Sequence, residues 1–242
     1  MKKIDVTALG ELLIDFTENG VSAQGNPIFE AKPGADMMLT EDEVSEELIR
    51  NAGIFHFGTL SMTHEGVRAA TKKAIRIAEE ANCIISFDPN LRPPLWSSMD
   101  EAREQVLYGL AHCTILKISD NEIQWLTGEE DYTKGVEWIR SRYEIPLILV
   151  SMGKEGSRAY YQDMIAEAAP ILREDTIETT GAGDTFCGCV LHYVLEHGLE
   201  GLKKEDLQEM LAFANTAASI ITSRRGALKV MPSKEEIDSE RQ

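Results

Sequence analysis

The chain is acidic: its 242 residues carry a formal net charge of −17 at pH 7, and 43% of them are hydrophobic. This hydrophobic content is enough to bury one substantial core, so length and composition predict a single globular domain. The excess of Asp and Glu argues against a nucleic acid or an anionic membrane as the partner.

Cysteine and histidine positions argue against two common kinds of site. The histidines show no metal-ligand spacing, and the cysteines fit neither a disulfide framework nor a zinc site; they are Cys83, Cys113, Cys187 and Cys189. Cys187 and Cys189 would point to different sides of one helix, so we interpret them as small apolar packing residues. The first residues lead into an alternating strand rather than a long apolar run. We therefore expect a cytoplasmic, reduced protein with no signal peptide and no membrane span.

The first third of the chain predicts strands before it predicts helices. Residues 4–9 and 12–16 read as two strands, with Asn19-Gly20 as a turn. Thr40 then begins a helix to about Arg50, with a capping box between Thr40 and Glu43. Strand 54–57 and a helix from about Glu65 follow. The apolar face of that helix predicts that it packs on a sheet.

The remaining chain alternates strands and helices regularly. The predicted strands are 83–87, 113–118 and 146–151, each nearly continuously apolar, and helices near 97–111 and 132–142 flank them. A further helix ends at Gly128, and an antiparallel pair lies around 157–168. Two long helices, 184–197 and 204–223, bury apolar faces that include Leu195 and Ala218, and 233–242 is a short surface helix or a frayed end. This alternation predicts a mostly parallel sheet covered by helices.

The sequence Thr179-Thr-Gly-Ala-Gly-Asp-Thr-Phe-Cys-Gly188 is the stretch that most strongly suggests chemistry. Gly181 and Gly183 let backbone N–H groups approach an anion, and the helix beginning there adds unpaired donors and partial positive charge. Asp184 would repel a phosphate, so its position makes most sense if it accepts a proton from a substrate hydroxyl. A tight turn with an N-cap is the alternative interpretation, and the absence of Gly-Lys-Ser/Thr excludes a P-loop.

This stretch resembles the signature of the PfkB (ribokinase-like) carbohydrate kinases almost residue for residue. The resemblance implies that Gly181, Ala182 and Gly183 form an anion hole and that Asp184 is the catalytic base. It extends over essentially the whole chain and is greatest to bacterial fructokinases. The fold it implies is an α/β, doubly wound ribokinase-like sandwich, with a mostly parallel sheet and helices on both faces.

Two other stretches resemble the sugar-binding side of that family. Gly10-Glu-Leu-Leu-Ile-Asp15-Phe16 is similar to the start of fructokinases, which implies that Asp15 binds sugar hydroxyls; a solvent-facing strand residue is the alternative. Asp88-Pro-Asn-Leu-Arg-Pro-Pro-Leu-Trp96 follows a buried strand, where ligands of α/β sheets gather. Its resemblance implies that Asn90 and Arg92 face the sugar and the transferring phosphate. Solvated loop residues are the alternative here.

The resemblance also implies a nucleotide side. Its residues would be Lys117, Ser151, Gly153, Gly156, Asn215 and Gly226. Glu122 would organise Mg²⁺ and its waters, although Ser119 replaces the family's Asn and a helix-start carboxylate is a serious alternative. Glu178 and Thr180 stand where relatives can hold a monovalent cation such as K⁺, with Glu178 in place of the more usual Asp. Asn215 could otherwise be an exposed helix residue.

The chain departs from the family around residues 32–35. Two Pro-Gly strings of a fructokinase-like protein are fused here into Lys32-Pro-Gly-Ala-Asp36, and the Gly-Gly sugar motif, a helix, several strands and most of the lid between them are missing. A genetic deletion, an incomplete gene or record, and an omitted segment all remain open. We therefore expect one PfkB-type domain over residues 1–242 with an internal deletion near 32–35 and most of the lid absent.

The function implied by the resemblance is ATP-dependent phosphorylation of a sugar primary hydroxyl, most like fructose to fructose 6-phosphate. The cofactors would be ATP and Mg²⁺, with K⁺ uncertain, and the partners a small sugar and the nucleotide. A 2-keto-3-deoxygluconate or nucleoside kinase keeps the chemistry and changes the substrate. A nucleotide-binding remnant without catalysis is the alternative of a different class, because the lid is missing.

Overall fold

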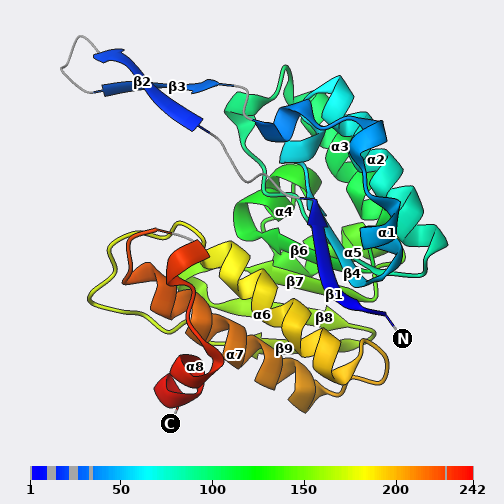
Figure 1. Ribbon diagram of the computed structural model, residues 1–242. Coiled ribbons are helices and arrows are strands. Elements are labelled where there is room, and N and C mark those ends of the chain that lie inside the picture. Colours follow the sequence, from blue (N-terminus) through cyan, green and yellow to red (C-terminus); the bar gives the residue numbers. More distant parts are fainter. Residues whose placement is uncertain (1, 10–14, 22–26, 33–34, 227, 242) are drawn as a thin grey trace. The chain divides into compact units, whose positions relative to one another are not determined.

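The computed structural model describes residues 2–9, 15–21, 27–32, 35–226 and 228–241. The chain divides into two compact units, residues 1–112 and 113–242, shown as ribbons in Figure 1. The expected segment Gly10 to Ile14 and the Pro33-Gly34 junction lie outside the described residues. Each unit is described by itself below.

The first unit is built on three parallel strands in the order β1 (Ile4–Leu9), β4 (Ala52–Gly58) and β5 (Ile84–Asp88). In the strand register, Ile54 of β4 lies opposite Val6 of β1 on one side and opposite Ile84 of β5 on the other. Strands β4 and β5 are nearly continuously buried, as the apolar runs predict for parallel strands covered on both faces. Helices α2 (Glu65–Glu80) and α3 (Met99–His112) pack against these strands.

Strands β2 (Asp15–Val21) and β3 (Pro27–Lys32) form a separate two-stranded antiparallel sheet, with Asp15 paired to Lys32. The expected turn at Asn19-Gly20 is wrong, because both residues lie within β2. The register between the strands shifts from Glu18 to Val21. Asn and Gly are favoured at such irregularities as well as in turns, which explains why the sequence signal was ambiguous.

The helix expected over 41–50 is two short elements. A 3₁₀ turn, η2 (Glu41–Glu43), follows the 3₁₀ turn η1 (Ala35–Met38), and α1 is confined to Glu46–Arg50. The capping box is present: Glu43 accepts hydrogen bonds from the Thr40 N–H (2.9 Å) and hydroxyl (2.8 Å). Val44 then turns extended, and the Ser45 hydroxyl caps α1 by accepting from the Leu48 N–H. A second N-cap inside the segment therefore divides the helix.

The second unit contains four strands in the order β6 (Ile115–Ser119), β7 (Leu147–Ser151), β8 (Ser157–Tyr161) and β9 (Met164–Ala168). Strands β6 and β7 are parallel, and β7, β8 and β9 are antiparallel neighbours, as the sequence predicts. Between β6 and β7 lie α4 (Asp120–Thr127) and α5 (Tyr132–Arg140). Gly128 ends α4 in the left-handed conformation at φ 77°, which favours glycine.

Helices α6 (Ala182–His197) and α7 (Lys204–Thr222) pack on each other, and α7 also covers β8 and β9. Two expected core positions are wrong: Leu195 is 36% exposed, and Ala218 is only partly buried. The C-terminal segment is a capped helix, α8 (Lys234–Glu240), rather than a frayed end. Its Ile237 is buried against Ala217 and Ile220 of α7.

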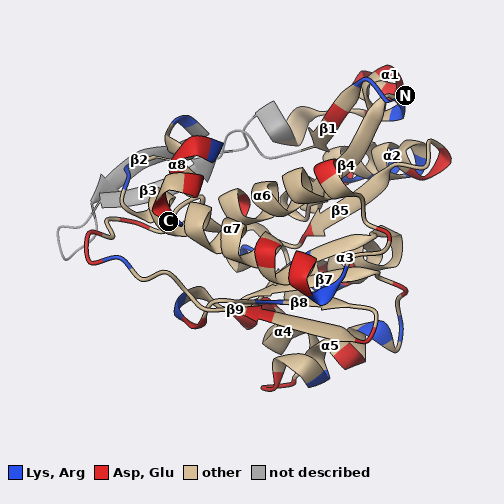
Figure 2. Cartoon of the chain, turned by 90° about the horizontal axis from the view of Figure 1, so that it is seen from below, with Lys and Arg blue, Asp and Glu red and all other residues tan. Residues whose placement is uncertain are grey.

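Charged side chains are largely excluded from the cores of both units, and Figure 2 shows them on loops and helix surfaces while the strands are mostly uncharged. Among the described residues, the charged side chains in the buried class are Asp88, 5% exposed, and Lys117, 6% exposed. No helix in the described part of the chain is long and apolar enough to cross a membrane. Because burying a charge is costly without a partner, Asp88 and Lys117 direct attention to the ends of β5 and β6.

Candidate active site

The beginning of α6 is built to leave backbone donors open. Gly181 is its N-cap and adopts φ 77° and ψ −2°, a left-handed conformation that a side chain would strain. No described side chain caps this helix end. The Thr185 N–H does bond to the Gly181 carbonyl at 2.8 Å, which starts the helical pattern. The Ala182 N–H donates to the Thr179 carbonyl at 3.2 Å, which leaves the Gly183 and Asp184 N–H groups and the positive end of the helix dipole to bind an anion.

Lys117 brings a second positive group to this helix end. Its side chain is buried in β6, and a methyl group added at Gly183 would lie 3.4 Å from the ammonium Nζ. A larger residue than glycine at 183 would therefore crowd the lysine. Ammonium and helix N-terminus converge on one place, and two positive groups so placed complement an anion such as phosphate.

Asp184 is the third residue of α6, and its side chain is exposed. The N-cap is Gly181 instead, so the alternative interpretation of Asp184 as the capping residue is wrong. Among the described residues we find no hydrogen bond or ion pair to its carboxylate. The carboxylate therefore stands beside the anion-binding turn in a position where it can accept a proton from a bound ligand.

A cavity of about 510 Å³ opens at this helix end, entirely within the second unit. It brings together six of the residues expected to contact a nucleotide or its phosphates: Ser151, Gly153, Gly156, Ala182, Gly183 and Asn215. The other expected residues of the nucleotide side and the catalytic turn are not among the lining residues: Lys117, Glu122, Glu178, Thr180, Gly181, Asp184 and Gly226. The volume lies in the range of small-molecule and cofactor pockets.

The turn from β7 to β8 forms one wall of the cavity. Gly153 begins the 3₁₀ turn η5 (Gly153–Glu155) at φ 52°, and Gly156 follows at φ 95°. A Cβ atom at Gly156 would lie 2.2 Å from the Ala168 carbonyl oxygen, so no other residue fits without moving β9. Glycine is therefore needed at 156 because the backbones of this turn and of β9 lie close together beside the cavity.

Asn215 is buried on α7, and its amide is fully engaged with the chain. Its Nδ2 donates to the carbonyl oxygens of Ala168 (3.2 Å) and Ala169 (3.0 Å), and its Oδ1 accepts from the Ser157 hydroxyl (2.9 Å). The alternative of an exposed helix residue is wrong. In the structure, Asn215 holds the exit of β9 against the cavity wall.

Several lining residues were not identified from the sequence. The loop after β9 supplies Pro170, Ile171, Leu172, Arg173, Thr176 and Thr179. Helix α7 supplies Asn215, Ala218, Ser219 and Thr222, which follow one another at helical spacing. A stripe of small and polar residues on an otherwise apolar helix was the available signal, and assigning Ala218 to the core concealed it.

Glu122 takes the role that its alternative interpretation predicted. Its Oε2 accepts from the Ser119 N–H and hydroxyl, both at 2.8 Å, and the Glu122 N–H donates to the Ser119 hydroxyl at 3.3 Å. This reciprocal capping box begins α4 at the carboxyl end of β6. Serine at 119 therefore has a structural reason, and the metal role of Glu122 stays a prediction.

Glu178 fixes the loop that follows α7. Its Oε1 accepts from the Gly226 N–H at 2.7 Å, and its own N–H donates to the Thr222 carbonyl at 3.2 Å. The structure thus brings Glu178 and the Gly226 loop together, as the expected cation site requires. Thr180 is exposed. Among the described residues, no group of three or more His, Cys, Asp or Glu could hold a metal ion.

The expected sugar residues belong to the first unit. The Asn90 N–H donates to Asp88 Oδ1 at 3.2 Å, and Asn90 adopts φ 45°, a conformation that Asn tolerates better than most residues. The Pro89 carbonyl accepts from the Thr59 hydroxyl at 2.5 Å, which fixes the start of this loop on the end of β4. Arg92 is exposed and donates to the Leu91 carbonyl. Asp15 begins β2, the strand that pairs with β3.

Two of the free cysteines, Cys113 and Cys189, are held as unreactive thiols by burial. Burial raises the pKa of Cys189 in α6 to about 12, and burial also raises the pKa of Cys113. Both therefore stay protonated near neutral pH and behave as small apolar groups. This confirms the interpretation of Cys189 as a packing residue, and it lies against the cluster that holds Ile237.

Comparison with known proteins gives the family. The model of the pfkB family carbohydrate kinases matches residues 16–234. The chain belongs to this family. It is 37% identical over 205 residues to the probable fructokinase-2 of Arabidopsis thaliana, an alignment that covers 85% of this chain and 62% of that protein. The chain spans between 55% and 65% of the length of the plant fructokinases that it matches.

Solved structures confirm the fold. A fructokinase double mutant from Vibrio cholerae O395, in a form with fructose, ADP and potassium ion bound, aligns with a TM-score of 0.77 at 24% identity. That alignment covers 93% of this chain and 70% of the other. A putative ribokinase II from E. coli, in complex with ATP and Mg²⁺, aligns at 0.76 and 24% identity over 90% and 68%. The ribokinase-like α/β fold expected from the sequence is therefore confirmed.

Proposed function

We propose that this pfkB family chain carries the ATP site and catalytic base of a sugar kinase that phosphorylates a primary hydroxyl, with fructose as the acceptor and fructose 6-phosphate as the product. The observation that carries the proposal is the uncapped start of α6, where Ala182 and Gly183 line the cavity. Lys117 Nζ approaches Gly183, and the exposed Asp184 follows it in the chain. The names of the relatives, probable fructokinases among them, favour fructose over 2-keto-3-deoxygluconate or a nucleoside.

The shape of the cavity suits an adenine nucleotide. Along α7, its lining runs from Asn215 to Thr222, about 10 Å at the helical rise per residue, which matches the length of a nucleoside. In this arrangement, the N–H groups at the start of α6 would meet the phosphates, and the side chains of Ile171 and Leu172 would make apolar contacts with the base. These two side chains are 40% and 70% exposed, so a planar base would cover them.

In the proposed reaction, the Asp184 carboxylate accepts the proton of the sugar hydroxyl as that oxygen attacks the γ-phosphorus of ATP. The bond to the β-phosphate oxygen breaks, and ADP leaves. Backbone N–H groups of the first α6 turn and the Lys117 ammonium hold the phosphate oxygens as negative charge shifts onto the leaving group. Asn90 and Arg92 are proposed to hold the sugar and the transferring phosphate, and Asp15 to bind sugar hydroxyls.

Metal ions are part of the proposal. Mg²⁺ usually reaches such sites on the phosphates of the nucleotide with few protein ligands, and the lack of a multi-carboxylate cluster among the described residues fits that mode. Glu122 is proposed to orient its waters. When bound, the ion would supply positive charge that neutralises the phosphates. We propose that Glu178 and Thr180 hold a monovalent cation; the Vibrio cholerae fructokinase, solved with a potassium ion bound, supports a role for such an ion.

A nucleotide-binding remnant without catalysis is the second candidate, because the chain spans at most 65% of the plant relatives. Two measurements separate the candidates. Calorimetry should show binding of ATP·Mg²⁺, and a coupled ADP-release assay should show release that depends on fructose. Binding without any fructose-dependent release supports the remnant, and no binding by the folded chain contradicts both.

A further inference from the structure

The loop between β9 and α6 crosses the face of the cavity and is attached to α7 at both ends. At its start, the Ala169 carbonyl accepts from Asn215, and at its end the N–H groups of Ile177 and Glu178 donate to the Thr222 carbonyl at 2.8 and 3.2 Å. Within the described part of the chain, residues 169–176 make no backbone-to-backbone hydrogen bond. The middle of the loop therefore depends on side chains for its position.

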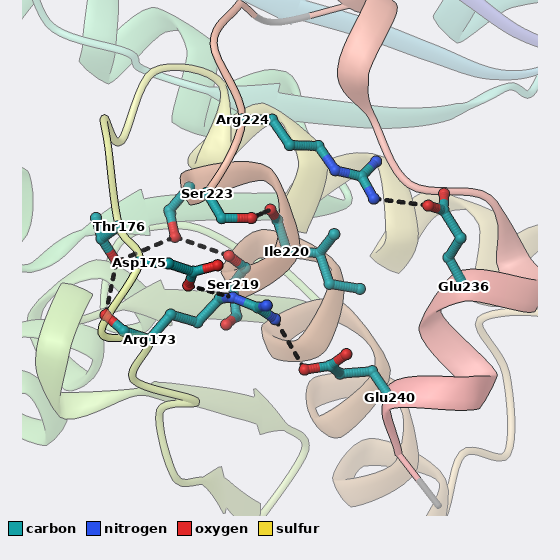
Figure 3. A network of polar contacts seen from close by, with 10 residues as sticks. Arg173, Asp175, Thr176, Ser219, Ile220, Ser223, Arg224, Glu236 and Glu240 are labelled. Carbon is teal, nitrogen blue, oxygen red and sulfur yellow. Dashed lines mark hydrogen bonds and ion pairs between the residues drawn. The ribbon is translucent and has the colours of Figure 1, made fainter.

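Arg173 occupies that middle position and lines the cavity. Its Nη1 lies 2.8 Å from Glu240 Oε1 of α8, and its Nε lies 3.0 Å from Asp175 Oδ1 in the same loop. Figure 3 shows the guanidinium between these two carboxylates, with α8 on the far side from the loop. The hydrogen bond that Arg173 donates to the Asp175 carboxylate raises the pKa of Arg173 and lowers the pKa of Asp175.

Helix α8 is a firm support for this contact. Its Ile237 is 3% exposed and packs on α7, and Arg241 just beyond it pairs with Glu209 of α7 at 2.7 Å. One turn before Glu240, Glu236 pairs with Arg224 at 2.6 Å. The same Arg224 donates to the Val230 carbonyl at 3.0 Å, so the chain between α7 and α8 is also tied down.

The loop side of the contact is braced as well. The Thr176 hydroxyl donates to the Arg173 carbonyl at 3.0 Å and lies 3.5 Å from the Thr222 hydroxyl (Figure 3 shows Thr176 beside Arg173). Arg173 is thus fixed through its backbone by the end of α7 and through its guanidinium by α8. The two apolar residues that precede it, Ile171 and Leu172, carry their side chains into the same cavity.

We propose that Glu240 is a positioning residue for nucleotide binding: it holds Arg173 from α8 and so fixes the loop wall formed by residues 170–176. This inference rests on the proposed nucleotide site and adds to it a role for the C-terminal helix, which contributes through one of its two glutamate ion pairs. If Arg173 is released, the loop stays attached only at its two ends and its middle becomes more mobile. The nucleotide must then order this segment as it binds, and the lost conformational entropy weakens its affinity.

The test compares two single substitutions that each remove one ion pair of the α8 region. Glu240→Gln breaks the contact with Arg173, and Glu209→Gln breaks the contact with Arg241, which anchors the helix without touching the loop. Partly exposed ion pairs contribute little, so we expect ATP·Mg²⁺ to bind Glu240→Gln about 2- to 5-fold more weakly by calorimetry. Glu209→Gln should bind as the wild type does.

Hydrogen exchange without nucleotide gives an independent arm. The amides of Ile177 and Glu178, which donate to the Thr222 carbonyl at the end of the loop, should exchange faster in Glu240→Gln than in the wild type or Glu209→Gln, while amides in the middle of α7 stay unchanged. Equal exchange in all three proteins overturns the inference even if ATP binds. Equal loss of affinity in both variants also overturns it, because the effect would then come from general loosening of α8. Faster exchange with no ATP binding by the wild type contradicts the nucleotide role and the proposed function together.

Discussion

The nucleotide side and the sugar side of this chain differ in how their residues are held. In the second unit, the expected residues sit on packed elements: Gly156 against the Ala168 carbonyl, Asn215 on three hydrogen bonds, Lys117 buried in β6. In the first unit, Asp15 stands on a two-stranded sheet of its own, and Arg92 is exposed. A two-stranded hairpin alone is marginally stable in water, so the sugar side needs further structure to become rigid.

A sugar kinase must both bind its nucleotide and orient its sugar, and in this chain the residues expected for these two tasks lie in different units. The groups proposed to bind nucleotide and to accept the proton lie in one unit and are held by elements of that unit. The groups expected to orient the sugar lie in the other unit, which also contains residues 32–35, where the sequence predicts that the lid is absent. Binding of nucleotide and transfer to sugar should therefore respond differently to the same changes.

The largest effect is expected at Asp184. Asp184→Asn keeps the shape of the side chain but cannot accept the proton, so fructose-dependent ADP release should fall about 10²- to 10⁴-fold. ATP·Mg²⁺ affinity should stay near the wild-type value, as calorimetry can measure. Glu196→Gln, near the other end of α6, is the matched control and should leave both unchanged. Near-native turnover in Asp184→Asn would remove the proposed base.

The next largest effect concerns the missing lid. Orientation and water exclusion lower reaction barriers strongly, and misplacement alone can reduce rates about 10²-fold. We expect the 242-residue chain to phosphorylate fructose poorly and to hydrolyse ATP slowly. A family-type insert between Lys32 and Ala35 should raise fructose turnover about 10²-fold and suppress the hydrolysis. Comparable steady-state kinetics in the two proteins would show that the lid is dispensable.

A smaller effect distinguishes the two units directly. Lys117→Met keeps the side-chain length and removes the charge beside the α6 turn, so the dissociation constant of ATP·Mg²⁺ should rise about 10-fold, the loss of one charge-assisted hydrogen bond. Adenosine, which has no phosphate, should bind both proteins alike. Arg92→Ala, in the other unit, should leave ATP·Mg²⁺ affinity near the wild-type value and lower kcat/KM for fructose. Parallel losses in all these measurements would contradict the separation.

The smallest effect tests the carboxylate at the start of α4. Ser119→Ala removes the hydroxyl of the capping box and should lower the free energy of unfolding by about 1 kcal/mol. Ser233→Ala removes the same group from the capping box of α8 and is the control for capping alone. Denaturant titrations give both values. If Glu122 also orients Mg²⁺ waters, only Ser119→Ala should weaken ATP·Mg²⁺ relative to ATP without metal.

The sequence predicts elements well where a local signal decides them. The apolar runs of β4 to β7 and the glycine at 128 fix strands and a helix end without reference to distant residues. The helix over 41–50 failed because Ser45 competes as a second N-cap, and the Asn19-Gly20 turn failed because the same residues suit an irregular strand. Both errors arise where one residue type serves two local structures.

The part of the candidate site that could be predicted from the sequence is the part formed by glycine-containing backbone turns. Gly181, Gly153 and Gly156 could be named because their conformations demand glycine, whereas the loop wall of Ile171 to Thr176 has no such demand. The contacts that hold this loop come from Asn215, Thr222 and Glu240, and each contact joins residues 46 to 67 positions apart in the chain. Periodicity within one element cannot show contacts of that separation.

Strand β1 has a consequence for the behaviour of the protein in solution. Within the residues described for the first unit, it pairs with β4 and with no strand on its other side, and Val6 on it is 36% exposed. The unpaired backbone groups of such an edge can accept a strand from a second molecule, and Asp5 is the one acidic side chain on β1 that opposes this. Association should therefore grow with protein concentration while both units remain folded, and light scattering at rising concentration, not a melting curve, is the measurement that will reveal it.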